Sequence, residues 1–420
     1  MYAETVNLVL VAGESSGDQL AAVLLQGAQA NYAQVSSAGI VGEAMQKQGA
    51  QSWWPSQSLA VRGYFEPIRH LPRILKMRSE LIERVVSQRP DVFIGIDAPD
   101  FNLGVEKTVR AKGVPTMHYV SPSIWAWRPK RIEKIRQAVD HMLLIFPFEQ
   151  KIYDEAGIPA TYVGHPFAKQ IPLQADTAAA RDLLNVSQES FCLALLPGSR
   201  ASEVSYNAPN FFKAAQLIAQ RAGTAQEVQC LVPVAHTNLR PELERIAREC
   251  APSLSIRWFD GQARSVMEAA DATIVASGTA SLEVALYKKP SIISYKTSWL
   301  SAQIYPKVAL LPWIGLPNIL MQESFIPEIL QDEATAEEQD DEPQQFVPGV
   351  ELTVAQQVLR QHLDEYIAAM ATNMPMTSEK AAGHQLSLFT VIQGILSQEG
   401  AVFIAEMDNL LAKIKDNRDG

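Results

Sequence analysis

The 420-residue sequence is poor in cysteine and in positive charge, and it has no long hydrophobic run. Its three cysteines are an odd number without a C-x-x-C pair, which argues against a disulfide framework and a zinc cage. The 36 Lys and Arg face 46 Asp and Glu, for a net charge of −10, so bulk electrostatics gives no support for nucleic-acid binding. No apolar run approaches ~18 residues, and we expect no membrane-spanning helix.

Several common nucleotide and metal motifs are also missing. The sequence contains neither G-x-G-x-x-G nor G-x-x-x-x-G-K-[ST], which argues against a dinucleotide fingerprint and a P-loop. The seven histidines show no metal-binding spacing, so we expect no metal and no cofactor. The first residues, Met1–Thr5, lack a basic region typical of a signal peptide. A reducing cytoplasm fits the cysteine usage, with Cys192 and Cys230 as small core residues.

Short, continuously apolar runs alternate with helical patterns along the chain, which is typical of parallel sheets covered on both faces. Two such series predict two doubly wound α/β domains, 1–170 and 171–345, followed by C-terminal helices in 346–420. The polar stretch from Gln170 to Asn185 is interpreted as a linker, and the acidic run from Asp332 to Glu342 as a solvated insert. The expected strands are Val6–Ala12, Val35–Ile40, Val92–Ile96, Thr116–Val120, Met142–Ile145, Thr161–Val163, Phe191–Leu196, Val228–Pro233, Leu254–Trp258, Thr273–Ala276 and Ser291–Tyr295.

The most informative stretch is Leu193–Arg200, where an apolar strand stops at a Pro-Gly-Ser turn and one arginine follows. A helix-compatible segment, Ala201–Ala222, begins there. The first N–H groups of a helix have no internal partner and, with the helix dipole, favour a phosphate. A guanidinium adds planar, charged donors. Ser199 and Arg200 are therefore expected to bind a phosphate, although an ordinary strand–helix turn has the same pattern.

A second strand, small-residue turn and helix follow later in the chain. The turn backbone at Gly278 and the hydroxyls of Ser277 and Thr279 are expected to donate to a phosphate. Glu283, expected in the first helical turn, could accept from two ribose hydroxyls, or could simply be favoured there by the helix dipole. Farther on, Asn318 could orient a base or a sugar. Together with Arg200, these residues fit a nucleoside diphosphate.

The first half opens with a strand, a glycine-rich turn and a helix at Val11–Asp18. Glycines in such a turn let a ligand approach the backbone closely. Glu14 and Ser15 are candidate substrate contacts, and Ser16 is a candidate N-cap of the helix. A capped turn without a substrate contact is the alternative.

The run Val92–Asp100 ends a buried strand with the carboxylate of Asp97, at the edge where open α/β sheets bind ligands. Apolar neighbours are expected to raise the pKa of Asp97 by desolvation, which suits a general base. Asp100 is a candidate cap for the next helix, a substrate contact or the base itself. The spacing favours Asp97 without excluding Asp100, and both acids could instead have only structural roles.

Residues 61–89 form a basic amphipathic pattern. On a helix, Ile68, Leu71 and Leu75 share an apolar face with Ile82 and Val86, opposite a basic face. Such a helix either packs on its own sheet or lies on an anionic membrane surface. The candidate membrane-contacting residues are Tyr64, Phe65, Ile68, Arg69, Leu71, Arg73, Leu75 and Lys76.

Five of these stretches, in this order along the chain, closely resemble the lipid-A-disaccharide synthase family. They are Val11–Asp18, Gly95–Asn102, His118–Arg128, Leu195–Arg200 and Ala276–Glu283. The likeness extends from about Val6 to about Leu330; the acidic insert departs from the family pattern, and the helices after it are only generally similar.

The resemblance implies a GT-B glycosyltransferase with two Rossmann-like domains that face a cleft. Its donor would be UDP-2,3-diacylglucosamine and its acceptor 2,3-diacylglucosamine 1-phosphate, giving the β-1,6 lipid A disaccharide 1-phosphate and UDP with inversion. Asp97 matches the family's proposed base, and Arg200, Glu283 and Asn318 match positions implicated in donor binding or catalysis. The acylated substrates favour the membrane interpretation of residues 64–76, and so a peripheral protein on the cytoplasmic face of the inner membrane. The sequence leaves a homodimer open.

Two other functions share some of these features. A UDP-sugar epimerase can share the two-domain scaffold, but it would need acid/base pairs around one sugar and no lipid surface. A non-enzymatic sensor of nucleotide sugars would bind UDP without turnover.

Overall fold

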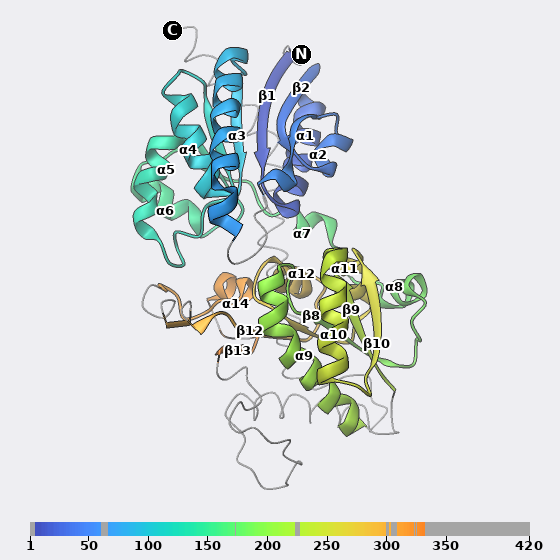
Figure 1. Ribbon diagram of the computed structural model, residues 1–420. Coiled ribbons are helices and arrows are strands. Elements are labelled where there is room, and N and C mark those ends of the chain that lie inside the picture. Colours follow the sequence, from blue (N-terminus) through green and yellow to red (C-terminus); the bar gives the residue numbers. More distant parts are fainter. Residues whose placement is uncertain are drawn as a thin grey trace. The chain divides into compact units, whose positions relative to one another are not determined.

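The computed structural model describes residues 5–59, 66–172, 174–222, 227–299, 302–303, 309–322, 324 and 326–331. The described chain divides into two compact units, of which the first comprises the residues up to Gln170 together with 309–310 and the second comprises the rest. Most of the first unit is drawn in blue to green and the second in green to orange in Figure 1. The expected acidic insert and the expected C-terminal helices of 346–420 lie outside the described residues.

The first unit is a seven-stranded sheet in which all neighbouring strands are parallel. Its strand order is β3-β2-β1-β4-β5-β6-β7, so the chain reverses its direction of winding between β1 and β4. The edge strand β3 was not expected, because its short and partly exposed sequence lacks an apolar run. The strands are β1 (Thr5–Ala12), β2 (Gln34–Val41), β3 (Gln51–Pro55), β4 (Val92–Ile96), β5 (Thr116–Tyr119), β6 (His141–Leu144) and β7 (Ala160–Tyr162).

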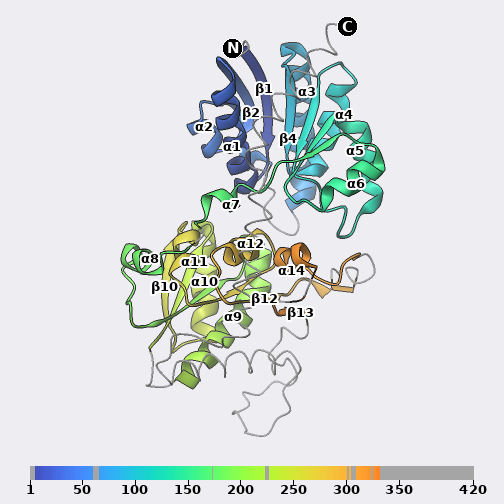
Figure 2. The ribbon, with the colours of Figure 1, turned by 180° about the vertical axis from the view of Figure 1, so that it is seen from behind.

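Helices cover both faces of this sheet (Figures 1 and 2). Alternate side chains of a strand point to opposite faces. Val9 and Val11 of β1 therefore pack with Phe93 of β4 against α3 and α4. The helical elements are α1 (Ser15–Asn31), α2 (Glu43–Lys47), η1 (Ser56–Ser58), α3 (Glu66–Gln88), α4 (Pro99–Arg110), η2 (Pro129–Arg131), α5 (Ile132–Ala138), α6 (Glu149–Ala156) and α7 (Phe167–Gln170).

The second unit repeats this plan with a six-stranded parallel sheet of order β10-β9-β8-β11-β12-β13. Its core contains Cys230, and Cys192 is also fully buried, as expected for small apolar residues. The strands are β8 (Phe191–Leu196), β9 (Val228–Val234), β10 (Ser255–Asp260), β11 (Ala272–Val275), β12 (Ser291–Tyr295) and β13 (Glu328–Leu330). The helical elements are α8 (Thr177–Leu184), α9 (Ala201–Ala222), η3 (Thr237–Leu239), α10 (Arg240–Cys250), α11 (Ala263–Ala269), α12 (Thr279–Leu286) and α14 (Leu316–Met321).

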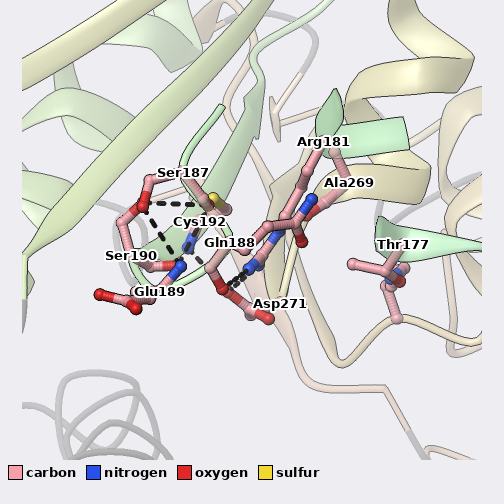
Figure 3. Close-up of polar contacts among 10 residues, drawn as sticks. Thr177, Arg181, Ser187, Gln188, Glu189, Ser190, Cys192, Ala269 and Asp271 are labelled. Atoms are coloured by element: carbon pink, nitrogen blue, oxygen red, sulfur yellow. Dashed lines mark hydrogen bonds and ion pairs between the residues drawn. The ribbon is translucent and has the colours of Figure 1, made fainter. Parts of the chain in front are cut away.

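All eleven expected strands are present, with ends within two residues of those predicted. The stretch expected to be a linker, in contrast, contains α8. The side chain of Asp176 caps this helix by accepting from the N–H of Ala179. Arg181 is buried and donates to Asp271 at 2.6 Å and to the carbonyls of Ala269 and Gln188 (Figure 3). The polar residues of the stretch from Gln170 to Asn185 therefore include a helix cap and a buried arginine that bonds to the rest of the unit, and are not those of a solvated linker.

Each unit has its topological switch point at its first and fourth strands, β1 and β4 or β8 and β11. These strands pair directly in parallel, so their carboxyl ends lie side by side. In open α/β sheets, ligands bind outside the carboxyl ends of the strands at this point. The expected site residues Asp97 and Arg200 both follow such strands.

Candidate active site

In the second unit, the turn after β8 is built around Gly198, which has φ +128°. A side chain at this position would be strained and its Cβ would collide with Glu203, so glycine is required. The carboxylate of Glu203 accepts from the backbone N–H groups of Ser199 at 2.9 Å and Arg200 at 3.2 Å. These N–H groups were expected to face a phosphate; in this structure an internal carboxylate takes that place.

The side chain of Arg200 belongs to the same cluster. Its Nη1 lies 3.2 Å from Oε1 of Glu203. The Arg200 side chain is nevertheless 61% exposed, against 15% for Glu203. Because Glu203 lies on the first turn of α9, it fixes one side of the guanidinium while the exposed part stays accessible to an anion.

The turn after β11 lies beside the turn after β8, because the N–H of Ala276 donates to the carbonyl of Leu196. Gly278 has φ +145° and is the N-cap of α12, and both Gly278 and Thr279 are exposed. Ser277 donates its hydroxyl proton to the carbonyl of Ile314 at 2.8 Å. A hydroxyl has one proton, which in this conformation is used inside the protein; the expected donation of this hydroxyl to a phosphate stays a prediction.

Glu283 is the fifth residue of α12 and so lies in its second turn rather than in the first turn expected. Its Oε2 accepts from Nε of Arg264 at 2.9 Å. Burial raises the pKa of Glu283, and the Arg264 guanidinium partly opposes that shift. The other oxygen, Oε1, accepts no hydrogen bond from the described part of the chain and could receive one from a ligand hydroxyl.

Asn318 is fully buried on α14 and uses its amide inside the protein. Its Nδ2 donates to the carbonyl of Ile326 and to Glu328, each at 2.8 Å, and its Oδ1 accepts from the N–H of Ile326. Glu328 also accepts from the N–H groups of Ile314 and Gly315. The amide of Asn318 was expected to contact a base or sugar directly; in this structure it instead bonds to Ile326 and Glu328. Glu328 was missed because β13 is a three-residue strand.

In the first unit, Asp97 follows β4 directly and is half-buried. Both Asp97 and the next residue, Ala98, have left-handed backbones, with φ of 51° and 43°. Ala98 is the N-cap of α4, so the expectation that Asp100 caps this helix is wrong. Asp100 instead lies in the first turn, 83% exposed, and forms an ion pair with Arg131.

The turn after β1 exposes Glu14, which is the N-cap residue of α1. Ser15 begins the helix, and Ser16 lies inside it, so Ser16 is not the cap that was expected. The sequence analysis also missed the role of Asp18. This buried carboxylate accepts from backbone N–H groups at the start of α2, including that of Gly42 at 2.9 Å. It ties the first turn of α1 to the start of α2.

The basic amphipathic pattern forms helix α3, of which Glu66–Leu71 are described without their side chains. Met77, Leu81 and Val85 form the buried face of this helix, and Ile82 and Val86 of the expected apolar face are partly buried against the same core. Leu75 is 50% exposed, and its neighbours Arg73 and Lys76 are exposed. The candidate residues Tyr64 and Phe65 lie outside the described residues, and the side chains of Ile68, Arg69 and Leu71 are not described.

The described residues contain neither a candidate metal site nor a candidate membrane span. No group of three or more His, Cys, Asp and Glu side chains could hold a metal ion there. Within the same residues, each helix is too short or too polar to cross a bilayer.

Comparison with known proteins connects these motifs to one family. The model of the family described as Lipid-A-disaccharide synthetase matches residues 8–382. A Lipid-A-disaccharide synthase from Burkholderia pseudomallei is 48% identical over 331 residues, covering 79% of this chain and 84% of that protein. Another from Albidiferax ferrireducens is 46% identical over 333 residues, covering 79% and 85%.

Solved structures share the fold at low sequence identity. A UDP-GlcNAc 2-epimerase from Neisseria meningitidis bound to UDP-GlcNAc has a TM-score of 0.58 at 10% identity, covering 97% of this chain and 100% of that chain. A glycosyltransferase from Rickettsia africae has a TM-score of 0.55 at 10% identity, covering 99% and 100%. At these identities the likeness concerns the fold alone, which is of the GT-B type.

Proposed function

Because the chain belongs to the lipid-A-disaccharide synthetase family and is therefore a glycosyltransferase, we propose that it joins UDP-2,3-diacylglucosamine to 2,3-diacylglucosamine 1-phosphate. The products are the β-1,6-linked disaccharide 1-phosphate and UDP. The main structural support is that the half-buried Asp97 and the accessible Arg200 each follow a strand at a topological switch point.

The proposed reaction is a single displacement at the anomeric carbon of the donor. The oxygen of the acceptor hydroxyl attacks the anomeric carbon, and the bond between that carbon and the UDP oxygen breaks. The carboxylate of Asp97 takes the proton of the acceptor hydroxyl. One displacement inverts the α-linked donor to a β-linked product. General-base catalysis of this kind contributes ~10²–10⁴-fold. Glu14 and Ser15, at the start of α1, and Asp100, in the first turn of α4, are proposed to contact the substrates.

We assign donor binding to the second unit. The exposed guanidinium of Arg200 neutralises the diphosphate, whose charge grows as UDP leaves. The exposed backbone at Gly278 and Thr279 donates hydrogen bonds to it, and Ser199, whose N–H is held by Glu203, contacts it through its hydroxyl. In this assignment Ser277 supports donor binding by its hydrogen bond to the carbonyl of Ile314, and Asn318 supports it by its hydrogen bond to Glu328. The free oxygen of Glu283 accepts from a ribose hydroxyl.

The direct test is a product assay with purified protein and both acylated glucosamine substrates. Mass spectrometry should detect the tetraacylated disaccharide 1-phosphate, with one UDP released per disaccharide. Turnover should persist in EDTA, since the proposed base and the Arg200 cation are side chains. Absence of disaccharide, or conversion of UDP-N-acetylglucosamine alone to an epimer, would contradict the proposal.

We also propose that the start of α3 rests on the cytoplasmic surface of the inner membrane, where acylated substrates reside. The exposed Leu75 would enter the acyl boundary, and Arg73 and Lys76 would meet lipid phosphates. The other proposed contacts are Tyr64, Phe65, Ile68, Arg69 and Leu71, which lie in or next to the same helix.

Leu75→Asp is expected to weaken binding to phosphatidylglycerol vesicles about tenfold, because full burial of a leucine side chain contributes ~1.5–3 kcal/mol and Leu75, at 50% exposed, can gain about half of it. The measurement is vesicle cosedimentation, with the melting temperature checked for each variant. Leu183→Asp is the matched control, since Leu183 is a 69% exposed leucine of the second unit. Equal vesicle binding by both variants and the wild type would contradict the assignment of α3.

A further inference from the structure

The backbone that carries Asp97 is unfavourable on its own. Asp97 and Ala98 are consecutive residues with a Cβ, and both have positive φ, which disfavours them relative to glycine. Such a conformation persists only where surrounding contacts hold it, and it often occurs at functional sites. The N–H of Asp97 donates to the carbonyl of Tyr119 on β5 at 2.9 Å. That contact fixes one end of the Asp97 peptide and leaves its carbonyl to be held by another group.

The group that holds this carbonyl is the side-chain amide of Asn102, on the first turn of α4. Its Nδ2 donates to the Asp97 carbonyl at 2.8 Å and lies 3.3 Å from the Val11 carbonyl and 3.4 Å from the Ile96 carbonyl. Of the two ends of the Asn102 amide, only the NH₂ group can donate to carbonyl oxygens, so these neighbours determine the orientation of the amide. One buried amide thus joins the ends of β1 and β4 to the backbone of Asp97.

Glycine at position 95 explains how α4 comes within reach. A Cβ on Gly95 would collide with Oε1 of Glu106 and would lie 2.8 Å from Cβ of Asn102. Glu106 is fully buried above β4 and contacts Nδ1 of His118, also fully buried, at 2.7 Å. His118 is the strand partner of Gly95 on β5. This close packing of α4 on β4 and β5 sets the position of Asn102.

No apolar side chain could replace the amide of Asn102 as the donor to the Asp97 carbonyl. Asn102 is fully buried, and its Oδ1 finds no hydrogen-bond partner among the described residues. A buried, unpaired oxygen is unfavourable, and most native structures contain few of them. A leucine of similar size would remove that unpaired oxygen, but it would leave the carbonyl of Asp97 without its donor.

We infer that Asn102 is a positioning residue for the reaction: its amide holds the left-handed Asp97–Ala98 backbone and thereby directs the Asp97 carboxylate at the acceptor hydroxyl. The inference rests on the proposed role of Asp97 as base. It assigns no direct substrate contact to Asn102, which is buried beneath the turn.

The test is a double-mutant cycle between Asn102→Ala and Asp97→Asn. Asn102→Ala should lower kcat about 10- to 100-fold while KM for the UDP-sugar stays within twofold, because donor binding lies in the second unit. In the Asp97→Asn background, Asn102→Ala should lower kcat by less than a further threefold, because the carboxylate that Asn102 positions is already absent. Asn102→Ser, whose hydroxyl can donate, should recover part of the kcat and takes over the test if the alanine variant does not fold.

Thr108→Val is the matched control, because it removes a hydroxyl that donates to the Gly104 carbonyl on the same helix without touching Asp97. Its kcat should equal that of the wild type. A full additional loss for Asn102→Ala in the Asp97→Asn background would overturn the inference, as would an Asn102→Ala variant with the wild-type kcat. A crystal structure of Asn102→Ala in which Asp97 and Ala98 keep their positive φ would overturn it independently of any assay. Failure of the proposed function would appear differently, as no disaccharide from the wild type.

Discussion

Replacing Asp97 by asparagine is expected to lower kcat by ~10²–10⁴-fold, the usual contribution of a positioned general base. The amide has nearly the shape of the carboxylate, so the left-handed turn and the buried Asn102 contact should persist. It cannot take a proton from the acceptor hydroxyl. Affinity for UDP should be unchanged, because the residues proposed to bind the donor lie in the second unit. Initial rates of disaccharide formation and calorimetric UDP titration give the two quantities.

Substitution of two further aspartates, Asp100 and Asp154, provides comparisons for this experiment. Asp100→Asn tests the alternative base, and its smaller expected loss reflects an exposed carboxylate that pairs with Arg131. Asp154→Asn is a control on α6, where the carboxylate of the exposed Asp154 accepts only from Gln150 among the described contacts. A normal rate of disaccharide formation by Asp97→Asn would exclude Asp97 as the base. A loss of that rate in Asp100→Asn alone would identify Asp100 as the base.

Replacing Arg200 by glutamine is expected to weaken UDP binding about 10- to 150-fold, which corresponds to the ~1.5–3 kcal/mol of one charged hydrogen bond. The kcat of the transferase should fall as well, since negative charge builds on the leaving diphosphate. The fold should survive, because the Arg200 side chain is 61% exposed and its described ion pair is with Glu203, three residues along the chain. Calorimetric titration with UDP and with uridine would separate the diphosphate from the nucleoside.

The Arg200 result needs a control for loss of surface charge. Arg245→Gln removes an arginine of the same unit that pairs with Glu242 and Glu249 on α10, and it should leave UDP affinity unchanged. Uridine affinity should be equal for the wild type and both variants. Equal UDP affinity of Arg200→Gln and the wild type would remove the diphosphate assignment from this turn.

The local sequence predicted the strands well, because continuous apolar runs bounded by turn residues are characteristic of buried parallel strands. It failed where the signal was weak or polar. The edge strand β3 and the three-residue β13 carry no such run. Helix α8 was interpreted as a linker because the buried, ion-paired state of Arg181 cannot be read from its neighbours in sequence.

The candidate site was predicted as a set of residues, but its internal contacts were not. Glu203 is in sequence an ordinary acid at the start of a helix, and only the folded turn brings its carboxylate to the N–H groups of Ser199 and Arg200. Asn318 was expected to face the ligand, whereas its amide braces Glu328. Hydrogen-bond partners are chosen by geometry, and residue type alone does not specify them.

By itself, the sequence determined two series of parallel strands, the turns that follow them and the placement of Asp97 and Arg200 at strand ends. These features depend on hydrophobic periodicity and turn chemistry within a few residues. The tertiary structure alone decided the strand order that brings β1 beside β4, and the contact of Asn102 with a carbonyl 91 residues earlier in the chain. Such contacts form only when the packing of helices on the sheet joins distant segments, and no local pattern encodes their distances.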